Sequence, residues 1–90
     1  MATLEQRIRA NFTETTYKGD EETEKELTDL VGKKCRCYDE GIDDGVDDDE
    51  CEDCYIYYSA FEFEDSQLNV IVYYGDQTGE ICDVEVRNAA

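Results

Sequence analysis

The sequence contains no histidine and no proline, and both absences limit what the chain can do. Without histidine, a serine-protease triad, the zinc-binding helix of metalloproteases and most general-base schemes lack the residue that transfers their proton. Without proline, there is no proline-rich linker to divide the chain. The glycine-rich fingerprints of dinucleotide and phosphate sites are also absent. We therefore expect a single domain that is not an enzyme.

Long apolar runs are missing too. No stretch approaches the ~20 apolar residues of a membrane span. Residues 1–10 lack the apolar region of a secretory leader. We expect a cytoplasmic protein that makes no membrane contact. In a reducing compartment of this kind, paired cysteines more often bind a metal than form disulfides.

Basic residues are missing from more than half of the chain. Residues 37–86 contain seventeen acids and no base, whereas the remaining residues contain eight acids and eight bases. The whole net charge of −17 therefore arises in one stretch. A field of this sign repels nucleic acid and anionic membranes and attracts basic protein surfaces. The alternative is that the acids serve only to keep the protein soluble, but acids with that role would be spread over all exposed elements.

The first helix is predicted over residues 3–12. Thr3 and Gln6 have the spacing of a capping box, and an apolar stripe follows at helical spacing. The members of this stripe are Leu4, Ile8 and Phe12.

A second helix is predicted to begin at Asp20, as its N-terminal cap, and to stop at Gly32. Its apolar stripe is thin, which predicts a helix that covers the core by one edge only. The stripe consists of Leu27, Leu30 and Val31.

After residue 54 the apolar period changes from helical to two, which is the period of strands. Three runs, 55–64, 68–74 and 82–86, are separated by segments of hairpin length, so we expect a three-stranded antiparallel meander. Cys82 lies on the predicted apolar face of the last run, where a lone cysteine is most often a small core residue. The predicted fold class is α+β in the order ααβββ. We expect residues 1–34 to form its helical part, 35–54 an acidic loop held by a metal site, and 55–88 the sheet.

The acidic loop has the sequence CRCYDEGIDDGVDDDECEDC and contains four of the five cysteines. Its two close pairs, Cys35 with Cys37 and Cys51 with Cys54, can supply the four thiolates of a structural Zn²⁺ site. Without histidine, a closed zinc site must consist of four cysteines. Disulfides, free thiols and iron in place of zinc are the alternatives. The surrounding carboxylates raise thiol pKa values, which disfavours redox chemistry and favours a divalent cation.

The same loop gathers carboxylates at a density comparable to that of DNA phosphates, which lie about one per 1.7 Å of duplex. If zinc holds the loop rigid, these acids can occupy a basic groove that nucleic acid otherwise fills. Three tyrosines expected on the exposed side of the protein, Tyr38, Tyr58 and Tyr73, can add contacts. The residues expected to bind the partner are Asp43, Asp44, Asp47, Asp48, Asp49 and Glu50.

In its size, its charge, this acidic loop and its lack of catalytic residues, the chain resembles the small acidic phage and prophage anti-CRISPR proteins that inhibit Cas9. The resemblance concerns general character and includes no diagnostic motif, so no residue role follows from it. It implies stoichiometric binding to the basic guide- or PAM-recognising surface of Cas9, in the cytoplasm of a bacterial host. Binding there would block the loading of guide or target DNA.

Two other functions fit the same residues. One is a zinc-stabilised adaptor for an unrelated basic protein, and the other is an inhibitor of another nucleic-acid enzyme, such as a restriction endonuclease. An inhibitor that imitates DNA competes with DNA for its partner, whereas an adaptor does not. The acids of residues 55–64, expected at a sheet edge, oppose pairing between two copies, so we expect a monomer.

Overall fold

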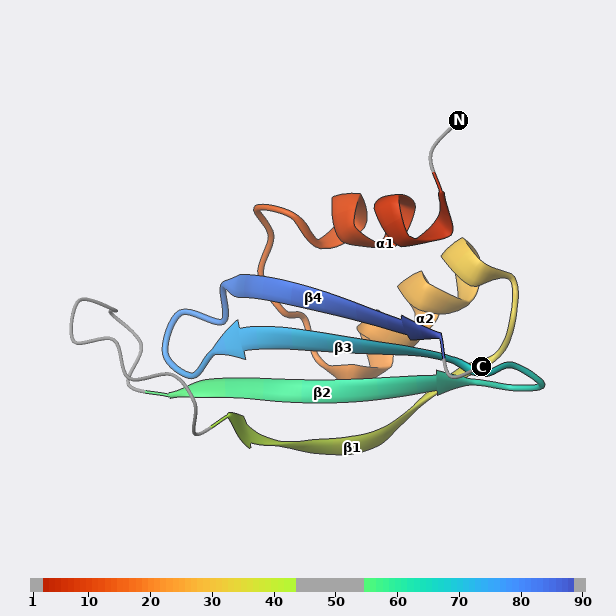
Figure 1. The fold of residues 1–90 in the computed structure, drawn as a ribbon. Helices are drawn as coiled ribbons and strands as arrows, with labels where there is room; N and C mark the ends of the chain where they lie inside the picture. The colour runs from red at the N-terminus through yellow and green to blue at the C-terminus, as the bar shows by residue number, and fades with distance from the viewer. Residues whose placement is uncertain (1–2, 44–54, 89–90) are drawn as a thin grey trace.

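The computed structural model describes residues 3–43 and 55–88, which form two helices followed by a four-stranded antiparallel sheet (Figure 1). The α+β class is confirmed. The sheet has the order β1-β2-β3-β4, so each strand pairs with its neighbour in the chain. The elements are α1 (Leu4–Phe12), α2 (Asp20–Val31), β1 (Cys35–Asp43), β2 (Ile56–Phe63), β3 (Leu68–Gly75) and β4 (Ile81–Asn88).

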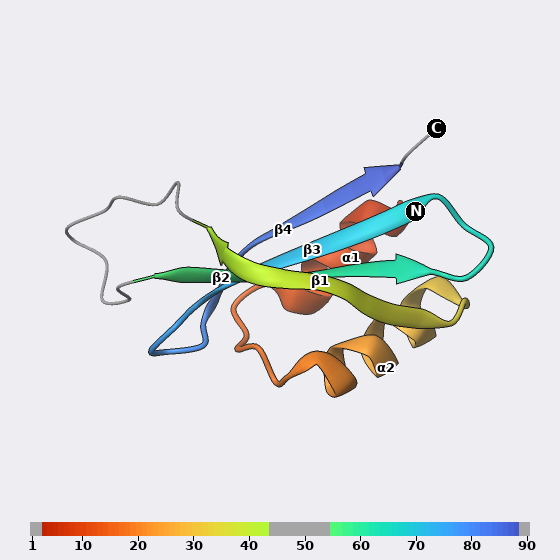
Figure 2. The ribbon, with the colours of Figure 1, turned by 90° about the horizontal axis from the view of Figure 1, so that it is seen from below.

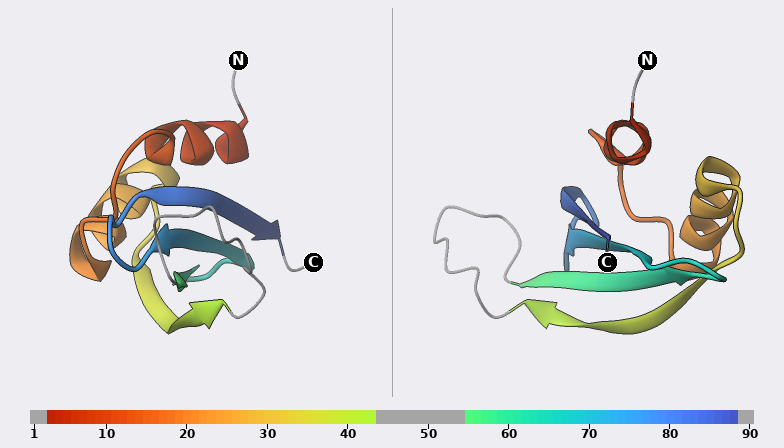
Figure 3. Two further views of the ribbon diagram at one scale, coloured as in Figure 1. Left: turned by 90° about the vertical axis from the view of Figure 1, so that its left-hand side faces the viewer. Right: turned by 45° about the vertical axis from the view of Figure 1, so that its right-hand side comes forward.

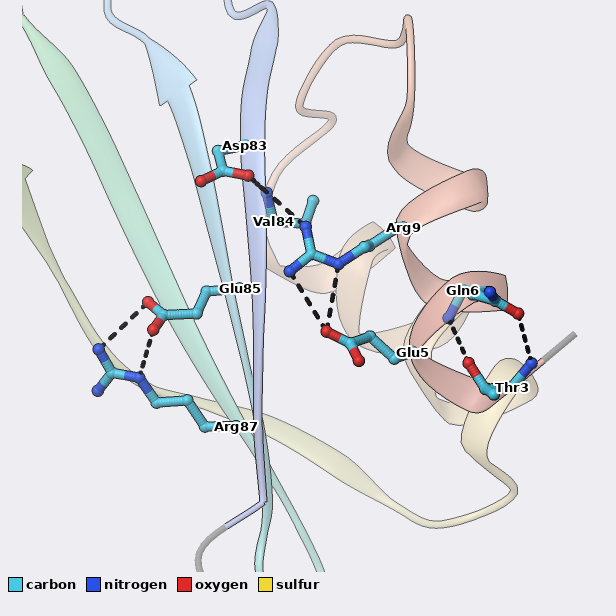
Figure 4. Close-up of polar contacts among 8 residues, drawn as sticks. All are labelled: Thr3, Glu5, Gln6, Arg9, Asp83, Val84, Glu85 and Arg87. Carbon is cyan, nitrogen blue, oxygen red and sulfur yellow. Dashed lines mark hydrogen bonds and ion pairs between the residues drawn. The ribbon is translucent and has the colours of Figure 1, made fainter.

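The predicted capping box of α1 is confirmed. Thr3 Oγ1 accepts the backbone N–H of Gln6 at 3.2 Å, and the Gln6 side chain accepts the backbone N–H of Thr3 at 2.9 Å (Figure 4). Further along α1, Arg9 lies between two carboxylates. It is 3.4 Å from Glu5 in the same helix and 3.7 Å from Asp83 of β4. Because all three side chains are largely exposed, these ion pairs add little stability.

The start of α2 differs from the prediction. The N-cap is Gly19, with a φ of 105°, and Asp20 is the first helical residue rather than the cap. A positive φ favours glycine at this position, and it turns the chain so that Asp20 faces the sheet. The end of α2 is as predicted. Gly32 adopts the left-handed conformation and donates its N–H to the carbonyl of Thr28 at 2.8 Å.

Residues 35–43 form a strand, β1, where a loop was predicted, so the sheet has four strands rather than three. Asp, Glu and Gly are poor strand formers, and their presence conceals this strand in the sequence. Its partner, β2, is rich in apolar residues and pairs with it from Cys35–Phe63 to Asp43–Ile56. Cys35 and Cys37 are therefore strand residues and not part of a loop.

Both helices cover the same face of the sheet, and the opposite face carries neither of them (Figures 1 and 3). The core lies between this covered face and the helices. Phe61, Val70 and Val72 of the sheet have no exposed surface, and neither do Ile8 of α1 and Leu27 of α2. The predicted apolar faces of the runs at 55–64 and 68–74 are thus confirmed at the strand centres.

Cys82 is exposed, which corrects its predicted place in the core. The register of β3 and β4 shifts by one residue, because Tyr74 pairs with Ile81 whereas Tyr73 pairs with Asp83. This bulge inserts Cys82 as an extra residue and reverses the alternation of faces. Ile81 takes the core position in its place and is 9% exposed, and Val84 regains the expected face.

The strand formed by residues 56–63 is not an edge strand, because β2 lies between β1 and β3. The edges of the sheet are β1 and β4. Part of each edge is covered by other segments. The backbone N–H of Ile81 donates to the carbonyl of Thr15 at 3.0 Å, and Glu24 of α2 accepts a backbone N–H of β1. Covered edges of this kind resist pairing with another chain.

Replacing Phe61 by Ala should lower the free energy of unfolding by about 3–5 kcal/mol, because a fully buried ring leaves a cavity under both helices. The matched control is Tyr55→Ala, at a side chain that is 56% exposed, where the change should be less than about 0.5 kcal/mol. Urea unfolding followed by circular dichroism measures both. Equal losses in the two variants would contradict the assignment of the core.

Candidate functional site

A cluster of polar side chains lies on the covered side of the sheet, at the start of α2. Asp20 Oδ1 accepts hydrogen bonds from the Tyr17 hydroxyl and, at 3.2 Å, from the Ser59 hydroxyl of β2. The Ser59 hydroxyl also lies 3.3 Å from the hydroxyl of Tyr74, whose ring stacks on that of Tyr17 with centroids 4.0 Å apart. Ser59 is fully buried. These contacts hold the Asp20 carboxylate in one orientation against the sheet.

Cys37 and Glu40 of β1 lie beside Asp20. One ligand atom from each of the three side chains lies within 4.8 Å of the other two. The irregularity of β1 at Tyr38 produces this grouping, because strict alternation from Cys37 would place Asp39 on the covered face instead of Glu40. A carboxylate oxygen of Glu24 accepts the backbone N–H of Cys37 at 2.8 Å, which joins α2 to β1.

This environment raises the pKa of five groups, and burial is the main cause for the phenols of Tyr17 and Tyr74. Burial raises the pKa of the Cys35 thiol to about 12 and that of the Cys37 thiol to about 11, and neighbouring carboxylates add to both shifts. A hydrogen bond with Asp20, together with the charge of that residue, raises the pKa of the Glu40 carboxyl. Both thiols are therefore protonated at neutral pH unless a metal binds them, and a protonated thiol is a poor nucleophile.

A thiolate and two carboxylates suit a borderline cation such as zinc. Zinc holds its donors about 2.0–2.3 Å from its centre, so the side chains of Asp20, Cys37 and Glu40 would move inward by less than about 1 Å to bind it. Their ligand atoms belong to exposed or half-buried side chains. This group and the predicted four-cysteine set have Cys37 in common, so both cannot be filled at once.

The structure places two of the four predicted zinc ligands. Cys35 is 6% exposed and packs in the core beside Phe63, whereas Cys37 is half-buried on the same face. Five residues of strand lie between Cys37 and Asp43 at the other end of β1, a distance of roughly 20 Å. Cys51 and Cys54 lie outside the described residues, so the four-cysteine site stays a prediction. Such a site would require Cys35 to leave the core.

Of the predicted partner-binding acids, Asp43 is the last residue of β1. The structure adds an acidic element that the sequence analysis missed, because α2 contains six acids and one base and lies against β1. Counting charge along the chain concealed it, since bases elsewhere in residues 1–36 balance these acids. The composition of the predicted helix was the available signal. The other predicted acids lie outside the described residues: Asp44, Asp47, Asp48, Asp49 and Glu50.

Bases gather at the opposite end of β1 from Asp43. Lys33 and Lys34 precede the strand, and Arg36 is its second residue. The Lys33 ammonium donates to the carbonyl of Asp65 at 3.1 Å, and Arg36 pairs with Glu62. Strand β1 therefore begins at a basic end and leads along the chain to the acidic residues 44–54.

Figure 2 shows the sheet from the face that carries neither helix. The three predicted tyrosines line a hollow on this open face. Tyr38 is 47% exposed, whereas Tyr58 and Tyr73 are half-buried, with ring centroids 6.4 Å apart. Gly41 makes room for the Tyr58 ring, because a Cβ at Gly41 would lie 3.0 Å from the Tyr58 hydroxyl oxygen. The Tyr58 hydroxyl donates to Asp39 at 3.3 Å.

Comparison with protein-family models, with curated proteins and with solved structures gives no match. Among the helices of residues 3–43 and 55–88, none is both long enough and apolar enough to cross a membrane.

Zinc binding can be assigned by native mass spectrometry of the purified chain before and after chelation. The sequence predicts one zinc per chain, and Cys37→Ser should abolish it because both ligand sets contain Cys37. Under the four-cysteine prediction, the double variant Cys51→Ser/Cys54→Ser should also lose the metal, whereas Cys82→Ser should retain it. If the Cys51→Ser/Cys54→Ser variant keeps its zinc and the Asp20→Asn/Glu40→Gln variant loses it, the four-cysteine prediction is wrong.

The raised thiol pKa predicts slow alkylation of Cys37 in the metal-free chain. With a pKa of about 11, the thiolate fraction at pH 8 is about one part in a thousand and grows about tenfold with each pH unit. Peptide mass spectrometry after timed iodoacetamide treatment should show that the alkylation rate at Cys37 still rises between pH 9 and pH 10, which lie roughly two units and one unit below this pKa. A rate that levels off near the ordinary thiol pKa of about 8.5 would show that the cluster leaves Cys37 unperturbed.

Proposed function

We propose that the protein is an anti-CRISPR inhibitor that binds a basic, nucleic-acid-binding surface of Cas9 through its acidic side. The observation that carries this proposal is the packing of α2 against β1. It places the acids of residues 20–29 beside β1, whose own acids continue along the chain into residues 44–54. Two acidic segments that are separate in the sequence thus meet on one side of the fold.

The charge density of this side suits a surface built for nucleic acid. The six acids of α2 occupy about 14 Å of helix, roughly one charge per 2 Å, which is close to the one per 1.7 Å of duplex DNA. A Lys/Arg groove that fits phosphates would meet carboxylates at comparable spacing. The net charge of −17 also accelerates encounter with a basic partner.

Blocking requires no chemistry from the chain. An inhibitor that occupies the groove excludes guide or target DNA in proportion to its own occupancy, in the cytoplasm of the bacterial host. A bound zinc ion would contribute by holding the acidic segment rigid, which lowers the entropy that is lost on binding. The expected complex is one monomer of this chain on one Cas9.

Two other functions use the same acidic side: an adaptor that docks another basic protein, and an inhibitor of a different nucleic-acid enzyme, such as a restriction endonuclease. Competition separates the first from the proposal, because duplex DNA should displace a DNA-like inhibitor but not an adaptor. Measuring the affinity of the chain for Cas9 and for a restriction endonuclease distinguishes the second function from the proposal.

Reversing Asp47, Asp48 and Asp49 to Lys should weaken binding to Cas9 by at least about a hundredfold, because three attractive charges become repulsive at a basic surface. Surface plasmon resonance with immobilised Cas9 measures the affinity, and a DNA cleavage assay measures the loss of inhibition. Both assays should use zinc-loaded and chelated protein.

The matched control reverses three acids away from the acidic side, Glu5, Glu64 and Glu80, and makes the same change in net charge. All three residues are exposed. This control should retain most of the affinity, and circular dichroism should show both triple variants folded. Unchanged Cas9 binding by the folded 47–49 variant would contradict the proposal, and so would equal losses in the two variants.

A further inference from the structure

The open face of the sheet contains a hollow of about 320 Å³, whose lining shares one residue, Asp39 of β1, with the proposed acidic surface. Its floor is formed by Ala60 and Ile71, which are 3% and 8% exposed, and its walls include the rings of Tyr38, Tyr58 and Tyr73. The volume is at the lower end of the about 300–1,000 Å³ typical of ligand pockets, so it suits a single side chain.

The charged residues that line this hollow are one acid, Asp39, and one base, Arg87. Asp39 projects to the open face because of the irregularity at Tyr38, and its carboxylate accepts the Tyr58 hydroxyl at 3.3 Å. Arg87 also lines the hollow, but its guanidinium pairs with Glu85 at 2.8 Å, on the side of β4 that faces away from α1 (Figure 4). Because Glu85 balances Arg87, the Asp39 carboxylate determines the sign of the site.

We propose that this hollow receives an arginine side chain of the basic partner protein. The inference rests on the proposed function and names a contact within it. An arginine guanidinium stacks flat on aromatic rings while its N–H groups bind a carboxylate, and the hollow offers both next to each other. Its aliphatic stem would lie on Ala60 and Ile71.

Other occupants fit less well. A purely apolar side chain would remove water from the Asp39 carboxylate without giving it a new partner. A nucleotide base could stack on the tyrosines, but its phosphate would meet the field of a chain with a net charge of −17. Lysine supplies the charge, but it lacks the planar group that stacks on a ring.

The test uses the full chain and a pair of short capped peptides, Gly-Arg-Gly and its citrulline counterpart, which keeps the shape of arginine and lacks its charge. Nuclear magnetic resonance should show the Ala60 methyl and Tyr38 ring signals shifting with the arginine peptide and not with the citrulline peptide. Asp39→Asn should weaken peptide binding about fivefold or more, because it removes a charge-assisted hydrogen bond. Tyr38→Leu should weaken it as well, because it removes an aromatic wall.

The controls are Asp65→Asn in the β2–β3 turn, which makes the same charge change, and Tyr55→Ala, at the other strongly exposed tyrosine. Each should alter binding less than about twofold, because a distant exposed charge is screened. Equal shifts with citrulline would overturn the inference, as would no shift at Ala60 and Tyr38, or equal losses in the Asp39 and Asp65 variants.

Cas9 binding separates this inference from the proposed function. If the peptide fills the hollow but Cas9 is not bound, the partner is wrong and the arginine site stands. If Cas9 binding requires residues 47–49 but is unchanged by Asp39→Asn and Tyr38→Leu, the function stands and the arginine site is overturned.

Discussion

The fold depends on the burial of one hydrophobic face, because the chain must fold against the repulsion of twenty-five acids with only eight bases to offset them. Phe61, Val70 and Val72 lie fully buried on that face, beneath Ile8 of α1 and Leu27 of α2. Apolar burial stabilises by roughly 25 cal/mol for each Å² removed from water, and this attraction has no dependence on charge. Because the core is one-sided, the acids remain in water around it. The protein can therefore carry a strong negative field without placing that charge in its interior.

The docking of α2 determines how this field is shaped. Leu27 anchors the helix in the core, Asp20 binds the buried Ser59, and Glu24 accepts the N–H of Cys37 on β1. The last contact also occupies a hydrogen-bond donor on an edge strand, which would otherwise be open to another chain. The same three contacts place the acids of α2 beside β1. Structural support and the proposed binding surface thus arise from one packing arrangement.

Two one-residue irregularities distribute the polar side chains between the faces of the sheet. The shift at Tyr38 places Glu40 beside Asp20 and Cys37 on the covered face, and it sends Asp39 to the tyrosines of the open face. The shift at Cys82 exposes that thiol and places Ile81 in the core. In both cases a single extra residue reverses the alternation of the strand. Glu40 of the cation-binding candidate and Asp39 of the proposed arginine site are therefore neighbours in sequence and lie on opposite faces.

The sequence by itself determined the features that are encoded locally: the capping box at Thr3, the stop of α2 at Gly32, and the apolar faces of β2 and β3. Each depends on residues a few positions apart, so spacing alone reveals it. Tertiary structure decided the rest. Strand β1 contains poor strand formers and forms because it pairs with β2. Asp20, which was expected to cap α2, instead accepts a hydrogen bond from Ser59, because Gly19 changes the direction of the chain. The two bulges and the meeting of α2 with β1 likewise depend on contacts between distant residues. At these positions the pairing of distant residues outweighs local propensity, so no pattern within a single segment predicts the result.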